Sequence, residues 1–192
     1  MAPGEKFVTI VSGLPRSGTS MMMHMLEAGG MTVITDNQRT ADVDNPQGYF
    51  EFEPAKTTKD DPSWLDGAEG KVVKMVYKLL YDLPDRFQYR VLVMRRAMQE
   101  VLASQRKMLE RLGKPTDTVP DEKIGALLAR QLREFDQWVR KQPNFTVLDV
   151  DYNQMVADPA PLIEKVNTFL GGGLDTVAMR SVVEPELYRN RA

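Results

Sequence analysis

Short apolar runs recur along the chain, and each is followed by polar or glycine-containing sequence. Four of these runs are rich in β-branched and other apolar side chains, as is typical of strands, and the first three have the largely apolar sequence of buried strands. They lie at residues 7–11, 72–76, 89–94 and 145–150, and a shorter β segment is predicted at residues 32–35. The pattern therefore predicts a sheet that is covered on both sides.

Between the predicted strands, other segments carry the signals of helices. Apolar residues at three- and four-residue spacing, or helix start and stop residues, predict helices over residues 19–26, 98–112, 121–141 and 158–170. Strands that alternate with helices form a parallel sheet with helices on both faces. We therefore expect an α/β fold, a three-layer sandwich with a central parallel sheet, in a single domain over residues 1–192.

Two stretches interrupt this alternation. Residues 36–70 are polar and rich in Asp, Asn, Pro and Gly, which predicts a long connection with at most one short helix. Residues 113–120 form a linker of Gly, Pro, Thr and Asp between two predicted helices. A connection as long as 36–70 within a compact domain usually serves a function, so we expect it to contribute to a site.

Composition narrows the chemistry that such a site can perform. The net charge of −2 argues against broad binding to nucleic acid or an anionic membrane, so any anion site has to be local. Without cysteine, and with His24 as the single histidine, the chain cannot form a Cys-ligated or multi-histidine metal site. The start of the chain lacks the features of a signal peptide, and no apolar run could span a membrane. We therefore expect a cytoplasmic protein.

Residues 13–20, Gly-Leu-Pro-Arg-Ser-Gly-Thr-Ser, lie between the first predicted strand and the first predicted helix. The two glycines let the backbone turn tightly and direct N–H groups at an anion. The helix N-terminus adds partial positive charge, Arg16 adds a cation with a planar donor fork, and Thr19 and Ser20 add hydroxyls. This order predicts a phosphate-binding loop. The alternative is a strand–helix connection that merely uses glycine.

The glycine spacing matches that of nucleoside triphosphate loops, but the lysine expected next is Thr19 here, which disfavours a kinase. Residues 15–20 instead resemble the 5′-phosphosulfate loop of PAPS-dependent sulfotransferases, commonly Pro-Lys/Arg-x-Gly-Thr-Ser/Thr. PAPS is 3′-phosphoadenosine 5′-phosphosulfate. The resemblance implies the P-loop NTPase-like topology. It also implies that Arg16 stabilises the bridging oxygen as the sulfuryl group leaves, and that the donor is bound by Pro15, Arg16, Ser17, Gly18, Thr19 and Ser20.

A second anion site is predicted from Arg96 and Ser104. Arg96 follows a predicted strand, and Ser104 lies eight residues later, two turns along a predicted helix. Sulfotransferases have a similar Arg and Ser at this spacing, which bind the 3′-phosphate. Family members often have Asp or Asn and then Pro after the arginine, where this chain has Ala97-Met98, and Arg95 is an alternative ligand. The plain alternative is a solvated basic pair and a helix serine that bonds its own backbone.

Residues 45–53, Asn-Pro-Gln-Gly-Tyr-Phe-Glu-Phe-Glu, resemble a segment of bacterial sulfotransferase-like proteins. An acceptor hydroxyl has to lose its proton during transfer, and a nearby carboxylate can take it. Glu51 is the first candidate for this base and Glu53 the second, against the alternative of solvated glutamates in a polar loop. His24 does not match the position of the family's histidine base. Near the C-terminus, Arg189 or Arg191 is a candidate for covering the 3′-phosphate or adenine, against the alternative of a frayed tail.

Together these features predict a sulfotransferase that moves a sulfuryl group from PAPS to a hydroxyl or amine, leaving adenosine 3′,5′-bisphosphate. The expected acceptor is a small molecule or one of glycan or lipid type, and no metal and no nucleic acid is expected. Two rival functions remain, a P-loop kinase of small molecules or nucleotides that uses ATP-Mg²⁺, and a non-catalytic nucleotide-binding module of the same fold.

Overall fold

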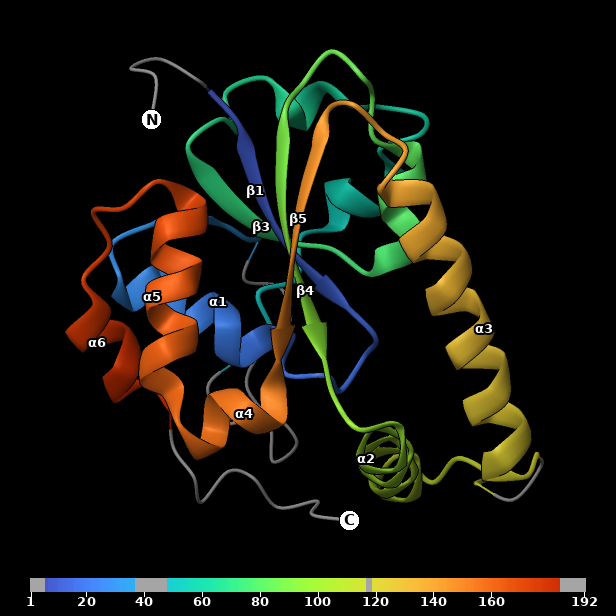
Figure 1. The fold of residues 1–192 in the computed structure, drawn as a ribbon. Helices are drawn as coiled ribbons and strands as arrows, with labels where there is room; N and C mark the ends of the chain where they lie inside the picture. Colours follow the sequence, from blue (N-terminus) through green and yellow to red (C-terminus); the bar gives the residue numbers. More distant parts are fainter. Residues whose placement is uncertain (1–5, 37–47, 117–118, 184–192) are drawn as a thin grey trace.

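A computed structural model describes residues 6–36, 48–116 and 119–183 of the chain (Figure 1). Its centre is a five-stranded sheet in the order β2-β3-β1-β4-β5, in which every neighbouring pair is parallel. The strands are β1 (Val8–Gly13), β2 (Thr32–Ile34), β3 (Lys71–Lys74), β4 (Tyr89–Arg95) and β5 (Phe145–Asp151). The α/β fold and the parallel sheet that the sequence predicts are therefore confirmed.

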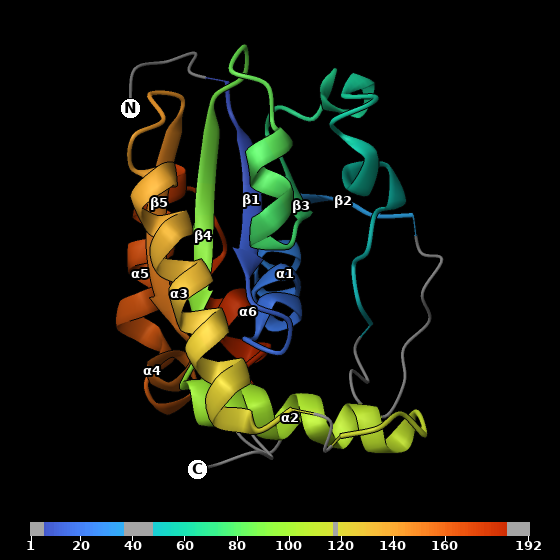
Figure 2. The ribbon, with the colours of Figure 1, turned by 90° about the vertical axis from the view of Figure 1, so that its right-hand side faces the viewer.

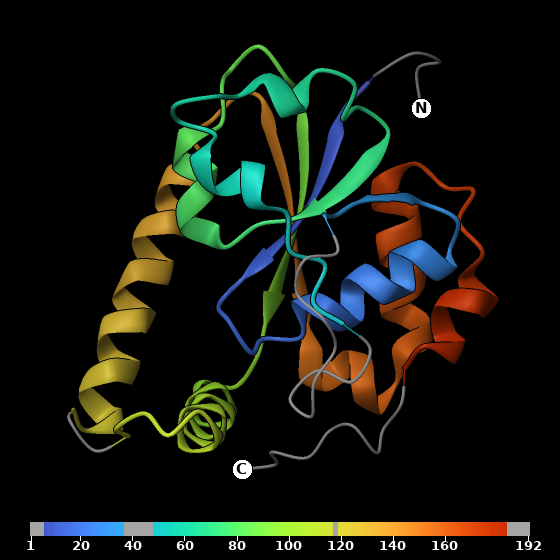
Figure 3. The same cartoon turned by 180° about the vertical axis from the view of Figure 1, so that it is seen from behind.

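Helices cover both faces of this sheet (Figures 1 and 3). One face is covered by α1 (Thr19–Ala28), α5 (Pro159–Leu170) and α6 (Thr176–Ser181). The other face is covered by α3 (Asp121–Val139) and by the 3₁₀ helices η1 (Glu53–Thr57), η2 (Ser63–Leu65) and η3 (Tyr77–Asp82). Helix α2 (Met98–Arg111) lies across the carboxyl ends of the strands, as does the short α4 (Tyr152–Ala157) (Figure 2).

Strand β4 shows how the sequence produces two cores. Val91 and Val93 face the core on the α3 side, whereas Leu92 and Met94 face the core on the α1 side. Successive side chains of a strand point to opposite faces, so a strand covered on both faces needs an unbroken apolar run. The same reason makes β1 buried along its whole length.

Two short helices, α4 and α6, were not predicted. Each begins at an aspartate whose side chain accepts hydrogen bonds from the first-turn backbone: Asp151 from Gln154, and Asp175 from Val177 and Ala178. Such helices have six residues, too few for an apolar repeat to appear. In the described part of 36–70, the structure contains two 3₁₀ helices where at most one short helix was expected. Within the described ranges, no helix is both long and apolar enough to cross a membrane.

Candidate functional site

All five strands end at the same edge of the sheet, and the loop after β1 meets Arg96 and Ser104 there. The strand order places β3 on one side of β1 and β4 on the other, so the chain changes direction around β1. In open parallel sheets, ligands bind at the carboxyl ends of strands where the order reverses. The loop after β1 and the arginines after β4 therefore lie where such a site is expected.

Residues 13–20, hereafter the glycine loop, make a tight turn between β1 and α1. Gly18 has φ +95°, and a Cβ there would lie 2.2 Å from Cδ2 of Tyr152. Arg16 also has a positive φ, +70°, which is rare for a residue other than glycine. The buried Ser17 hydroxyl donates to the Leu14 carbonyl oxygen at 2.7 Å and braces the loop from inside. Ser17 was predicted to bind the donor. In the structure, its side chain stabilises the turn of the loop.

Helix α1 begins at Thr19 with Ser20 beside it, and both residues are half-buried. Among the described residues, no side chain caps this helix, and its first turn holds no acidic residue. The N–H groups of a first helical turn have no partner inside the helix and carry partial positive charge. This helix start can therefore accept an anion.

Arg96 lies directly against the glycine loop. Its Nη1 donates to the carbonyl oxygen of Arg16 at 3.1 Å, and its Nε donates to Oε2 of Glu100 at 2.8 Å. The guanidinium carbon is 4.5 Å from the centre of the Tyr152 ring, in a cation–π contact. The Arg96 side chain is 7% exposed. Arg96, which the sequence spacing selected, therefore faces the glycine loop and also stabilises its backbone.

The side chain of Arg16 connects the loop to α2. Its Nε donates to Oγ of Ser104 at 2.9 Å, and Ser104 is buried with 2% of its surface exposed. The two predicted anion sites, 80 and more residues apart in the sequence, are thus in direct contact.

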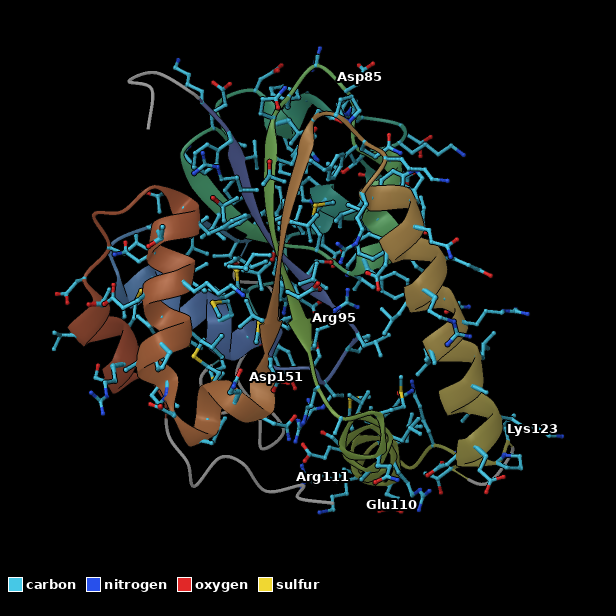
Figure 4. All side chains as sticks on the ribbon, viewed as in Figure 1. Asp85, Arg95, Glu110, Arg111, Lys123 and Asp151 are labelled. Carbon is cyan, nitrogen blue, oxygen red and sulfur yellow. The ribbon has the colours of Figure 1, made fainter. Side chains whose placement is uncertain are left out.

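Arg95, the alternative ligand, lies on the other side of β4. It is labelled in Figure 4. It pairs with Asp136 of α3 and, at 2.7 Å through Nε, with Asp149 of β5. Burial works to lower the pKa of Arg95, but the hydrogen bonds and charges of the two aspartates outweigh it and raise the pKa. Of the two arginines that the sequence left open, the structure places Arg96 at the loop.

The segment with the predicted base is fixed to the end of β2. The Glu51 carbonyl oxygen accepts hydrogen bonds from the Thr35 hydroxyl at 3.0 Å and from the Asp36 N–H at 3.2 Å. The Glu51 carboxylate lies 3.6 Å from Nζ of Lys56, and Glu53 also pairs with this lysine. The hydrogen bond that Lys56 donates to the Glu53 carboxylate is the main cause that raises the pKa of Lys56. Both candidate bases are therefore paired with one cation.

The aromatic residues before Glu51 contact α1 and β3. The Phe50 ring lies 4.4 Å from the ring of His24, edge to face, and His24 also lies 3.8 Å from Glu27. Tyr49 is buried, with Nζ of Lys74 5.7 Å from its ring centre. Lys74 ends β3 and is paired in register with Val11 of β1. The segment thus lies close to the strand end beside the glycine loop.

Three residues that contact the site, Glu100, Tyr152 and Asn153, were not predicted as functional. Of these three, only Glu100 could have been found from the sequence. A carboxylate four residues after an arginine can pair with it when the chain between them is helical. Arg189, Arg191 and residues 45–47 lie outside the described residues. Within the ranges that the structure describes, no three of His, Cys, Asp and Glu group so as to hold a metal ion.

Comparisons with known proteins give similarity in structure alone. No protein-family model and no curated protein matches the chain. The sulfotransferase STF1 of Mycobacterium tuberculosis is 16% identical with a TM-score of 0.54, over 93% of this chain and 70% of that one. Mouse sulfotransferase SULT7A1, complexed with PAP, is 14% identical with a TM-score of 0.55, over 97% and 68%. The sulfotransferase domain from the curacin biosynthetic pathway is 14% identical with a TM-score of 0.52, over 86% and 74%.

Proposed function

We propose that this chain, which has a sulfotransferase-like fold, transfers a sulfuryl group from PAPS to a hydroxyl or amine acceptor. The observation that carries the proposal is the contact between its two predicted phosphate subsites. Arg16 of the glycine loop bonds Ser104, and Arg96 bonds the backbone of Arg16. One phosphate cradle suits many nucleotides, whereas two adjoining cradles suit a nucleotide with phosphates at both ends of its ribose.

The donor groups at the site fit such a ligand. Two guanidinium groups and the start of α1 offer charge-assisted and backbone hydrogen bonds, which suit phosphate oxygens. The lysine that would contact the β- and γ-phosphates of ATP is replaced by Thr19. PAPS would supply a sulfuryl group joined to the 5′-phosphate through a bridging oxygen. The similar structure of mouse SULT7A1 is a complex with PAP, and this supports the choice of donor.

In the proposed reaction, the loop N–H groups and Arg16 neutralise the charge that develops on the leaving phosphate. A bond forms between the acceptor oxygen or nitrogen and sulfur while the bond from sulfur to the bridging oxygen breaks. Arg16 would have to leave Ser104 to reach the bridging oxygen, and Ser104 and Arg96 would then bind the 3′-phosphate. The acceptor proton would pass to Glu51, with Glu53 as the alternative, once the carboxylate has separated from Lys56.

A ligand panel separates this function from its rivals. Thermal unfolding is measured with adenosine 3′,5′-bisphosphate, AMP and ATP-Mg²⁺, each at 100-fold its dissociation constant or at the highest soluble concentration. Bound ligand at that excess adds about 2.7 kcal/mol of stability, so a clear rise in Tm is expected with the bisphosphate. A rise with ATP-Mg²⁺ alone would favour the kinase. Binding without transfer of labelled sulfate from PAPS to any of a panel of acceptors would favour the non-catalytic module.

A further inference from the structure

Glu100 is a buried carboxylate beside a site built to accept anions. It lies in the first turn of α2, and 4% of its surface is exposed. A carboxylate removed from water destabilises the fold unless it is paired and hydrogen-bonded. A negative charge here also opposes the binding of a phosphate. Its presence beside the site therefore requires a physical reason.

Both oxygens of Glu100 make hydrogen bonds. Oε2 accepts from Nε of Arg96 at 2.8 Å, and Oε1 accepts from Nδ2 of Asn153 at 2.8 Å. Oδ1 of Asn153 in turn accepts from the backbone N–H of Ala97, just before α2, at 3.3 Å. Glu100 thus connects the start of α2, the arginine after β4 and the start of α4.

The consequence for Arg96 is a guanidinium held on three sides. Glu100 binds its Nε edge, the Arg16 carbonyl oxygen accepts from Nη1, and the Tyr152 ring covers its face. A long side chain free in solution would lose about 2 kcal/mol of rotamer entropy on binding a ligand. Arg96 has already lost this freedom in the folded protein, so an anion that binds it has less entropy to overcome.

We propose that Glu100 is a positioning residue for the donor nucleotide. It acts through Arg96, which it holds in the orientation that binds the 3′-phosphate. This inference rests on the proposed function and adds a residue to it. The opposite possibility is that Glu100 only reduces the positive charge of the site. The two ideas predict opposite signs, because removal of the charge weakens bisphosphate binding in the first case and strengthens it in the second.

The test replaces the carboxylate by an amide of the same size, Glu100→Gln. Dissociation constants for adenosine 3′,5′-bisphosphate and for AMP are measured by titration calorimetry. The amide can still accept a hydrogen bond from Arg96 but lacks the negative charge that strengthens it, so the guanidinium is held less firmly and bisphosphate binding is expected to weaken about tenfold. AMP lacks the 3′-phosphate, so its affinity should change by less than about threefold. The ratio of the two affinities is the readout, because a general loss of folding would lower both equally.

Glu110→Gln is the matched control. It removes the same charge from the far, exposed end of the same helix (Figure 4), and it should leave the ratio unchanged. Asn153→Ala is the second variant, which removes the other partner of Glu100 and should lower the ratio in the same direction by about two- to threefold. It keeps the test decisive if Glu100→Gln does not fold.

Each outcome has a definite meaning. A fall in the ratio for Glu100→Gln and Asn153→Ala, but not for Glu110→Gln, supports the positioning role. Tighter bisphosphate binding by Glu100→Gln, or an unchanged ratio in a variant whose thermal unfolding shows that it is folded, overturns it. If the unsubstituted protein binds AMP and the bisphosphate equally, the proposed function fails first and the role of Glu100 with it. That failure is distinct because it is seen without any substitution.

Discussion

Arg16 has a strained backbone, and its side chain is part of the hydrogen-bond network of the site. Its φ of +70° costs of the order of 1 kcal/mol for a residue with a Cβ. The conformation is held from outside by Arg96, which bonds the Arg16 carbonyl oxygen, and by Ser104, which bonds its side chain. Strain that persists under such restraint is typical of functional loops.

Arg16→Gly should separate stability from activity. Glycine relieves the backbone strain but loses the hydrogen bond to Ser104, so we expect the free energy of unfolding to change by less than about 1 kcal/mol. Transfer from PAPS should fall at least about 100-fold, because the charge on the leaving phosphate is no longer neutralised. Denaturant unfolding and a labelled-sulfate assay measure the two quantities. Activity retained within a few-fold would contradict the role of Arg16.

Gly18 tests the packing of the loop against α4. Gly18→Ala places a methyl group within 2.2 Å of the Tyr152 ring, at φ +95°. Gly30 has the same φ of +95° but nothing within 4 Å of its Cβ position, so Gly30→Ala is the matched control. Both variants should lose about 1–2 kcal/mol from the backbone, and Gly18→Ala should lose at least about 1 kcal/mol more from the clash. Equal losses in chemical denaturation would show that this contact carries no strain.

At the scale of single residues, the sequence predicted the turn between β1 and α1 and named Arg96 and Ser104, but it did not predict the contact of the glycine loop with α4. Arg16, Gly18 and Thr19 lie within a few residues of one another, so their arrangement follows from local geometry. Tyr152 and Asn153 come from a helix more than 130 residues later, and no local pattern indicates where it lies. The resemblance assigned Arg16 and Ser104 to different phosphates of the donor, and the direct hydrogen bond between the two residues was not predicted.

Among the elements, α2 determines how the site is assembled. Glu100 and Ser104 are four residues apart, so they lie on one face of the helix, and both are buried against the loop and α4. The helix and its apolar spacing were predicted from the sequence. The position of α2 across the carboxyl ends of the strands was not predicted (Figure 2). Amphipathicity shows which face of a helix is buried, but it does not show which element packs against that face.

Ser104→Ala tests this arrangement of α2. Loss of the hydroxyl removes the acceptor for Arg16, so we expect the free energy of unfolding to fall by about 1 kcal/mol. Affinity for adenosine 3′,5′-bisphosphate should fall about tenfold and affinity for AMP much less. Ser181→Ala on the exposed end of α6, whose hydroxyl bonds only a carbonyl of its own helix among the contacts described, should change neither affinity. An unchanged bisphosphate affinity in Ser104→Ala would remove Ser104 from the donor site.

The whole molecule is a sheet with two apolar cores, and buried tyrosines lie in both of them. Burial raises the pKa of Tyr89 in one core and of Tyr152 in the other. The parallel sheet between two layers of helices was predicted because it depends on strong, repeated signals, whereas the strand order β2-β3-β1-β4-β5 was not. The six-residue helices and the 3₁₀ helices were not predicted from the sequence, because each is stabilised by one capping residue or by tertiary packing.

The raised pKa values predict loss of stability in alkali. An unfolded tyrosine has a pKa of about 10 and the folded ones have higher values, so their contribution is complete below pH 10 and is lost as the pH rises above it. Each buried tyrosine should lower the free energy of unfolding by up to about 1.4 kcal/mol per pH unit there. Tyr89→Phe should reduce the slope between pH 10 and 11 more than Tyr81→Phe, since Tyr81 is 44% exposed. The free energy of unfolding is obtained from thermal unfolding at each pH. Equal slopes against pH for Tyr89→Phe and Tyr81→Phe would contradict the assignment of the alkaline loss to the buried Tyr89.

The central claim is that two adjoining phosphate subsites at one edge of the sheet recognise the two ends of one nucleotide. Titration calorimetry with adenosine 3′,5′-bisphosphate and with AMP, in buffer containing EDTA, tests it directly. We expect the bisphosphate to bind at least about tenfold more tightly than AMP, because a second charged phosphate meets Arg96 and Ser104. Equal affinities for the two nucleotides, or a requirement for Mg²⁺, would contradict it.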